Sequence, residues 1–223
     1  MSESRGDRRK NRAANASGGA LSGDWLNDIK PDGMAGWEHL PDIGLYMDQV
    51  LTLVERQLTM YRRGDDDRLV SAAMVNNYIK DGLVPRAESK KYAPSHLALL
   101  LMIGTLKQVL SIPDIKRMIS AEKDPASVEK LYGRFLELQR AALRDTTDLV
   151  RRAGLPDRDT DPAEGRERLR RLALELVVEA RTRVLASQRV LDMLDQMDQV
   201  LPTETEELRH GRKDKEPESL GTN

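Results

Sequence analysis

The residues best suited to specific polar contacts are concentrated in one short segment, residues 70–92. Its first part carries two neighbouring asparagines, Asn76 and Asn77, and its second part carries an arginine and two lysines. Amides and cations of this kind form hydrogen bonds with base edges and ion pairs with phosphates. The residue types therefore favour non-covalent recognition of duplex DNA by a compact helix and an adjacent basic turn.

The apolar pattern in this segment predicts a short helix over 71–81. Ser71 is placed to cap its amino end, and Gly82 is placed to end it in a left-handed conformation. Four apolar residues recur at helical spacing and should face the core: Met74, Val75, Tyr78 and Ile79. The residues left on the outer face are Ala72, Ala73, Asn76, Asn77 and Lys80.

The next residues, 83–92, include a proline and are too few for a helix, so they predict a small β-hairpin. Its cations are Arg86, Lys90 and Lys91. Ser95 is then expected to cap an apolar helix over 97–109. Because that helix is hydrophobic nearly all round, it should form the centre of the core, and Gly104 should allow another helix to approach it closely.

Further helices are expected on both sides of this unit. Pro41-Asp-Ile predicts the start of a first helix, with Asp42 as its cap and Ile43 in its apolar stripe. Ser111 and Asp114 predict another capped helix after the apolar one. Beyond Asp124, two long amphipathic helices over 125–201 are expected to form a helical hairpin.

Each long helix has a predicted inward stripe. The first stripe consists of Val128, Leu131, Phe135, Leu138, Ala142, Thr146 and Leu149. The second consists of Leu169, Ala173, Leu176, Ala180, Val184, Leu191, Leu194 and Leu201. The interruptions at Arg183 and Ser187 make the second stripe a weak match to a coiled coil and a good match to a helical hairpin.

The whole chain is thus expected to be mainly α-helical with four parts. A disordered basic arm and a docking strap occupy 1–39, and a winged helix-turn-helix domain occupies 40–122. The helical hairpin occupies 125–201, and a disordered tail occupies 202–223. Arginines in the arm would add non-specific attraction to phosphates, although a solvated tail has the same composition.

Composition argues against several other classes. The net charge of −1 gives no global bias toward nucleic acid or membrane, so any basic surface must be local. With no cysteine and three scattered histidines (His39, His96 and His210), the chain is expected to hold no metal and no cofactor. The aspartates at 65–67 lack the spacing of a calcium loop and are expected to be solvated.

No signal peptide or membrane-length apolar run is visible, so a cytoplasmic protein is expected. An enzyme is not expected, because the chain shows no Gly-rich phosphate loop and no nucleophile constellation. Glu175 and Glu179 lie one turn apart on one helix, which by itself does not make a di-metal site.

Several motifs together resemble the MerR-type winged helix-turn-helix regulators. The stretch from Val70-Ser to Gly82-Leu-Val-Pro85 is similar to that family's capped helix with a tyrosine, which ends in Gly-Leu-Leu-Pro. Lys91-Tyr92, Ser95-x-Leu97 and Leu110-Ser-Ile-Pro-Asp-Ile115 look like its wing, third helix and closing helix, in the same order. In addition, Leu40-Pro-Asp-Ile-Gly-Leu-Tyr-Met-Asp-Gln-Val50 resembles the opening of an uncharacterised bacterial family, a domain of unknown function (number eighteen thirty-six).

The resemblance implies a homodimeric, DNA-binding transcriptional regulator. The 71–81 helix would enter the major groove and the 83–92 wing would hold the backbone. The implied contacts with DNA come from Ala72, Ala73, Asn76, Asn77, Lys80, Arg86, Lys90, Lys91 and Tyr92. Asn76 and Asn77 are the candidates for reading adenine, since an amide can bond to it bidentately.

The chain departs from the MerR pattern on the face that would meet DNA. Alanine stands at 73, where the family has a polar residue, and Asn76 and Asn77 stand where the family has Arg and Tyr. An altered outer face leaves a second function open, a helical adaptor that binds protein through a winged-helix scaffold without DNA.

Overall fold

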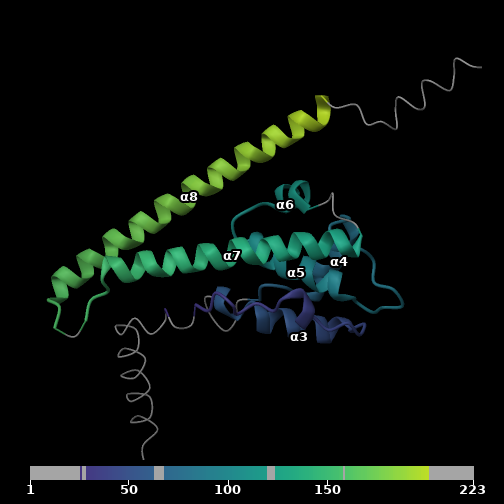
Figure 1. The fold of residues 1–223 in the computed structure, drawn as a ribbon, viewed down its shortest axis with the longest axis horizontal. Helices are drawn as coiled ribbons and strands as arrows, with labels where there is room; N and C mark the ends of the chain where they lie inside the picture. Colours follow the sequence, from purple (N-terminus) through teal and green to yellow (C-terminus); the bar gives the residue numbers. More distant parts are fainter. Residues whose placement is uncertain (1–25, 27–28, 63–67, 120–123, 158, 201–223) are drawn as a thin grey trace, which may run out of the picture.

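The chain is described by a computed structural model over residues 26, 29–62, 68–119, 124–157 and 159–200 (Figure 1). The described residues are mainly helical, as expected. The helices are α3 (Met47–Gln57), α4 (Ala72–Lys80), α5 (Pro94–Leu106), α6 (Ile112–Ile119), α7 (Pro125–Ala153) and α8 (Pro162–Val200). Two short 3-10 turns, η1 (Trp37–His39) and η2 (Thr59–Tyr61), flank α3. The predicted basic arm, the 65–67 aspartates, His210, Leu201 and the tail lie outside the described residues.

Helix α5 is the centre of the larger core. All of its residues from Ser95 to Gly104 are buried, because α3 and α7 pack against it. Gly104 lies where α5 meets the end of α3 and the entry to α4. A β-carbon at Gly104 would stand 2.5 Å from a methyl of Leu58 and 3.2 Å from a methyl of Val70. The predicted close approach at Gly104 is therefore present.

The first half of α7 belongs to this same core, as predicted for Val128, which is buried, and for Leu131 and Phe135, which are half-buried against it. The buried face is nevertheless centred on other residues than the predicted stripe. The buried residues of α7 are Val128, Tyr132, Leu136, Thr147 and Val150, and the predicted Leu138 is 55% exposed. Tyr132 decides the register, since its ring is fully buried and its hydroxyl donates to the Ala35 carbonyl at 2.7 Å. Burial also raises the pKa of Tyr132.

Two predicted helix starts are wrong. Helix α3 begins at Met47, so Asp42 does not cap it, and Ile43 is exposed instead of lying in its apolar stripe. The reason is that Leu45 is extended and exchanges two backbone hydrogen bonds with Tyr92, at 3.0 and 2.8 Å. Helix α5 begins at Pro94 with Ala93 as its N-cap residue, two residues before the predicted Ser95 cap.

The predicted hairpin takes a smaller form. No β-strand forms among the described residues; residues 83–92 contain a tight turn closed by one bridge between Glu88 and Lys91. The partner of Tyr92 is Leu45 rather than a second strand of the same segment. Pro85 has no N–H to donate, so this segment cannot form a regular ladder through that residue.

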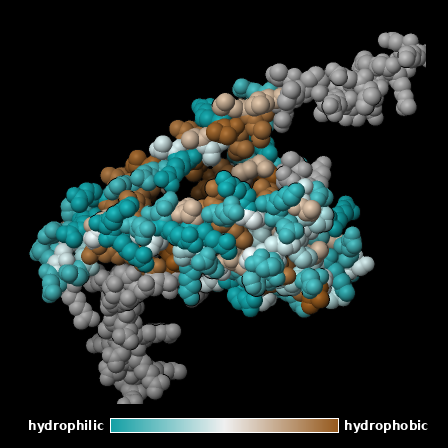
Figure 2. Space-filling view, viewed as in Figure 1, coloured by the Kyte–Doolittle hydropathy of each residue, from teal (hydrophilic) through white to brown (hydrophobic). Residues whose placement is uncertain are grey.

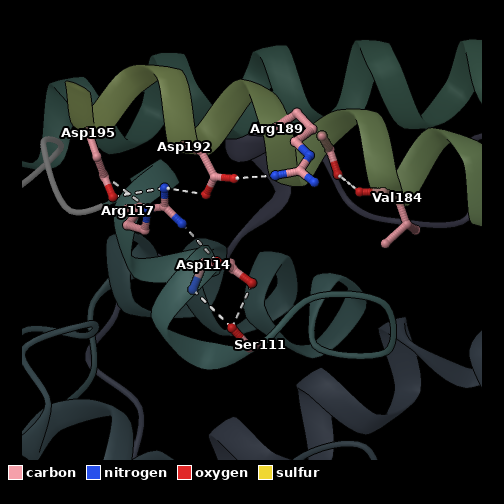
Figure 3. Close-up of polar contacts among 8 residues, drawn as sticks. Ser111, Asp114, Arg117, Val184, Arg189, Asp192 and Asp195 are labelled. Carbon is pink, nitrogen blue, oxygen red and sulfur yellow. Dashed lines mark hydrogen bonds and ion pairs between the residues drawn. The ribbon is translucent and has the colours of Figure 1, made fainter. Parts of the chain in front are cut away.

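Helix α8 contacts the rest of the chain at two places. Near its start, Leu172 packs with Leu26 and Val150 in a second, small core. Farther along, Arg117 on α6 bridges to Asp192 and Asp195 of α8 (Figure 3). Of the described residues of the predicted α8 stripe, only Leu191 is buried, because the two long helices diverge instead of pairing along their length (Figure 1).

The Arg117 contact is a fork rather than a single ion pair. Its Nε and Nη2 atoms meet the two carboxylate oxygens of Asp195 at 3.0 and 2.8 Å, and Nη1 lies 3.1 Å from Asp114. Asp114 in turn accepts the hydroxyl of Ser111, which also caps α6 as predicted. Bidentate geometry is the strong form of such pairs, so this cluster fixes where α8 meets α6.

The contact at Gly104 gives a direct test of the core. We expect Gly104→Ala to lower the free energy of unfolding by about 1–3 kcal/mol, because the added methyl overlaps Leu58. Gly133→Ala on α7 is the matched control: its added methyl meets nothing within 4 Å, so it should be neutral or stabilise by up to about 1 kcal/mol. Urea denaturation of both variants measures the difference. Equal stabilities would contradict the packing described here.

Candidate nucleic-acid interface

The outer edge of α4 carries the polar residues predicted for it. Val75 and Tyr78 are buried and Met74 and Ile79 are half-buried, as predicted. The exposed residues of the helix are Ala72, Ala73, Asn76, Asn77 and Lys80. The apolar side of α4 is therefore buried against the core, and its small and amide side chains remain accessible to a partner.

Both ends of α4 are fixed by local hydrogen bonds. The Ser71 hydroxyl accepts from the Met74 amide at 3.3 Å. At the other end, Gly82 has a φ of 70°, and the amides of Gly82 and Leu83 donate to the carbonyls of Ile79 and Tyr78 at 3.1 and 2.8 Å. This pairing is the Schellman arrangement, for which glycine is the preferred residue.

A lysine distant in sequence also anchors the end of α4. Lys116 on α6 donates through Nζ to the carbonyl of Asp81, the C-cap residue, at 2.6 Å. A cation at the carboxyl end of a helix is favourable because the last carbonyls carry partial negative charge. The sequence gives no sign of this contact, since the two positions are 35 residues apart and no local pattern connects them.

The basic turn follows α4 directly. Ser89 and Lys90 both have positive φ, 49° and 64°, and the Lys91 amide donates to the Glu88 carbonyl at 2.8 Å. Two successive positive φ values are the geometry of a tight two-residue hairpin turn. The exposed cations of this segment are Arg86, Lys90 and Lys91, as predicted.

Gly44 lets the turn lie close to the entry of α3. A β-carbon at Gly44 would stand only 2.7 Å from Cβ of Lys91. The lysine backbone can therefore pack against residue 44, and its ammonium group stays outside. The turn is held from both sides, by the Glu88 bridge and by the pairing of Leu45 with Tyr92.

The prediction that Tyr92 lies on the DNA-binding surface is wrong. Tyr92 is only 5% exposed, and its ring lies edge-on against His96 with centroids 5.5 Å apart. Burial raises the pKa of Tyr92. The residue therefore belongs to the core that holds the turn in place, and it is not part of the outer surface that would meet phosphate.

The charges around this face are mostly positive. Among the described residues, the cations of α4 and the turn are Lys80, Arg86, Lys90 and Lys91, and the acids beside them are Asp48, Asp81 and Glu88. All seven residues are exposed. A local excess of positive charge thus exists on a chain whose net charge is −1, which is the kind of surface that attracts a polyanion.

His96 is buried at the start of α5. Its Nδ1 accepts the amide of Ala93 at 3.0 Å, which ties the ring to the N-cap residue. Burial lowers the pKa of His96, while the backbone carbonyl of Arg86 and the carboxylate of Glu88 act in the opposite direction. His39, by contrast, is exposed beside Glu38.

The described residues hold no group of three or more side chains suited to a metal ion. None of the described helices is long and apolar enough to cross a membrane. Glu179 pairs with Arg183 on the surface of α8, at 3.6 Å.

Comparison with known proteins relates part of the chain to a family. Residues 35–135 match the family described as Domain of unknown function (DUF1836). This match covers just under half of the chain and nearly coincides with the larger core, whose residues run from Met34 to Leu136. No curated protein matches the chain, and no solved structure does.

The buried histidine predicts a pH dependence of stability. The pKa of His96 is lower in the folded state than its unfolded value of about 6.5, so the unfolded state binds the proton more readily. The free energy of unfolding is therefore not reduced by this histidine above about pH 6.5. Stability should then fall as the pH decreases through that value. In a phosphate-free buffer we expect His96→Gln to flatten the loss between about pH 7 and pH 5, since Gln can still accept the Ala93 amide but does not titrate.

Thermal unfolding at several pH values measures this effect. Exposed His39→Gln serves as the control and should leave the slope unchanged. A wild-type Tm that stays constant from pH 7 to pH 5 would contradict the burial of His96.

Proposed function

We propose that the protein is a cytoplasmic, DNA-binding transcriptional regulator with a MerR-like winged helix-turn-helix unit. The observation that supports the proposal is the exposed edge of α4, with Asn76, Asn77 and Lys80, directly beside the basic turn. An α-helix with its side chains is about 10–12 Å across, and the major groove is about 12 Å wide. A short helix with small side chains on its outer edge can enter such a groove.

The exposed residues would make different contacts with DNA, because their side chains differ in charge and hydrogen-bonding groups. Asn76 and Asn77 offer an acceptor and donors on each amide, which suits adenine edges. Lys80, Arg86 and Lys90 would neutralise phosphates and position the helix without reading sequence. Ala72 and Ala73 would let the first turn of α4 approach the bases and contact thymine methyl groups.

A homodimer forms part of the same proposal, because a palindromic site is read by two copies related by two-fold symmetry. Helix α8 has a suitable surface for a second copy (Figure 2). Val190, Met193, Leu194 and Met197 are exposed at i, i+3, i+4 and i+7 spacing, so they form one face. The resemblance to MerR-type regulators, which pair through a long C-terminal helix, favours a second copy as the occupant of this face.

A protein-binding adaptor is the competing function. The two alanines on the outer edge of α4 and the apolar face of α8 favour it, since both are suited to a protein surface. In that case the purified protein would retain a stoichiometric protein partner and no DNA.

Binding to duplex DNA should show the signature of phosphate contacts. Selection of genomic fragments by the purified protein should recover a palindromic site, and log affinity should fall linearly with log salt. We expect Lys90→Gln to weaken binding at low salt and to reduce the slope by about one, since each phosphate contact contributes about 0.9. Fluorescence anisotropy with the recovered duplex measures both quantities.

Arg152→Gln is the control for this experiment. Arg152 is exposed near the far end of α7, away from α4 (Figure 1). Removing its charge should leave the slope unchanged. If the wild-type protein retained no fragment even at low salt, or if both variants changed the slope equally, the DNA-binding proposal would be wrong.

The dimer has its own test. We expect the wild-type protein to run at twice the mass of one chain in light scattering coupled to size exclusion. Met193→Glu places a charge on the exposed face of α8 and should yield monomers, because an unpaired charge is costly in a buried interface. Ala173→Glu adds the same charge at an exposed position of the same helix, about 25 Å before Val190, and should remain dimeric. A monomeric wild-type protein would exclude this pairing.

A further inference from the structure

A surface cavity lies between the basic turn and the start of α5. It has a volume of about 630 Å³. The residues that line it are Gly44, Pro85, Arg86, Glu88, Ser89, Lys91, Ala93, Ser95, His96 and Pro125. The cavity therefore brings together the turn, the entry to α3 and the first residues of both α5 and α7.

The amino end of α5 contributes an unused backbone donor to this cavity. Pro94 has no N–H, and the amides of His96 and Leu97 donate to the Ala93 carbonyl at 3.0 and 3.3 Å. Ser95 is thus the residue of the first turn whose amide remains for an outside acceptor. The partial positive charge at the start of a helix adds to its attraction for an anion.

The Ser95 side chain supports the same reading. Ser95 is only 8% exposed, yet its hydroxyl forms no hydrogen bond with the rest of the described chain. The hydroxyl oxygen itself is not enclosed by protein atoms, so it can reach a ligand in the cavity that Ser95 lines. The hydroxyl and the amide of the same residue can both donate to one oxygen-rich ligand.

His96 supplies a second, independent indication. Because its Nδ1 accepts the Ala93 amide, a neutral ring must carry its proton on Nε2. That nitrogen is buried and makes no hydrogen bond of ordinary geometry to another described residue. The Arg86 carbonyl accepts from this ring only with poor geometry, so His96 places a weakly satisfied donor in the wall of the cavity, in a residue that is 7% exposed.

The charged groups of the wall favour an anion. Arg86 and Lys91 provide two positive charges, and Glu88 is the only acid among the described residues that line the cavity. An arginine can bind two phosphate oxygens in a fork, and a lysine binds them as a point charge. The wall offers charged, hydroxyl and backbone donors together, which is the donor set that phosphate groups receive in proteins.

We propose that this cavity binds a phosphate group, held by the amide and hydroxyl of Ser95 together with Arg86 and Lys91. If the protein binds DNA as proposed above, the phosphate belongs to the DNA backbone beside the groove that α4 enters. The inference then rests on that proposed function for the source of the phosphate, but not for the site itself. A small phosphorylated molecule has the same chemistry and is distinguished by the experiment.

Inorganic phosphate is the first probe. We expect the Ser95 amide to show a saturable chemical-shift change on titration with phosphate, at ionic strength held constant with chloride. Arg86→Gln should weaken this binding by about tenfold or more, since charge-assisted hydrogen bonds contribute the most. Ser95→Ala should weaken it severalfold, because it removes the hydroxyl and keeps the amide.

Arg56→Gln is the matched control, because Arg56 is exposed on α3 and does not line the cavity. It should leave the phosphate titration unchanged. Unfolding of each variant in chloride shows whether a loss of binding merely reflects a loss of structure. Since Ser95→Ala and Arg86→Gln remove groups without a partner in the core, both should unfold at nearly the wild-type temperature.

Duplex DNA is the second probe, and it identifies the source of the phosphate. If Ser95→Ala also weakens DNA binding severalfold, the cavity holds a backbone phosphate. If phosphate binds at Ser95 and DNA binding is unaffected or absent, the site stands and its ligand is a small phosphorylated molecule. If the Ser95 amide shows no saturable change, or if Arg56→Gln lowers phosphate affinity as much as Arg86→Gln does, the site is excluded even where DNA binds.

Discussion

The burial of α5 is the constraint on which the rest of this structure depends. A helix that is apolar on nearly every side cannot meet water, so other elements must cover all of it. Helix α3 and the first half of α7 do so, and Gly104 lets the chain around Leu58 and Val70 lie directly against its backbone. Because these apolar surfaces are buried against one another, the amides and the lysine of α4 lie on the solvent-exposed side of that helix.

The burial of the apolar side chains also determines where the polar side chains of the turn lie. Tyr92 turns inward to pack beside His96, and its backbone pairs with Leu45, so the basic turn is attached to the core at its base. The cations of the turn then extend from a rigid support. The same packing leaves the Ser95 hydroxyl without a hydrogen bond at the wall of a cavity, next to His96, whose Nε2 has no partner of ordinary geometry among the described residues.

Helix α8 is attached differently from the rest. A small apolar core near Leu172 and the forked ion pairs of Arg117 hold it at two points, and a face of Val190, Met193 and Met197 remains exposed. The ion pairs of Arg117 hold α8 in place through polar groups, so they do not bury the apolar face of that helix. The larger core and the family match end together near residue 135, so α8 and the second half of α7 extend beyond the part of the chain that the family defines.

The sequence by itself determined the features that depend on neighbouring residues: the Ser71 cap, the Gly82 stop, the apolar character of α5 and the outward side of α4. Their physical causes act within one or two turns of helix. Only the tertiary structure decided that Tyr132 rather than Leu138 enters the core, that Leu45 stays extended, that Lys116 caps α4, and where Tyr92 points. Each of these depends on a partner far away in the chain, and a periodic pattern contains no information about which distant surface will be available.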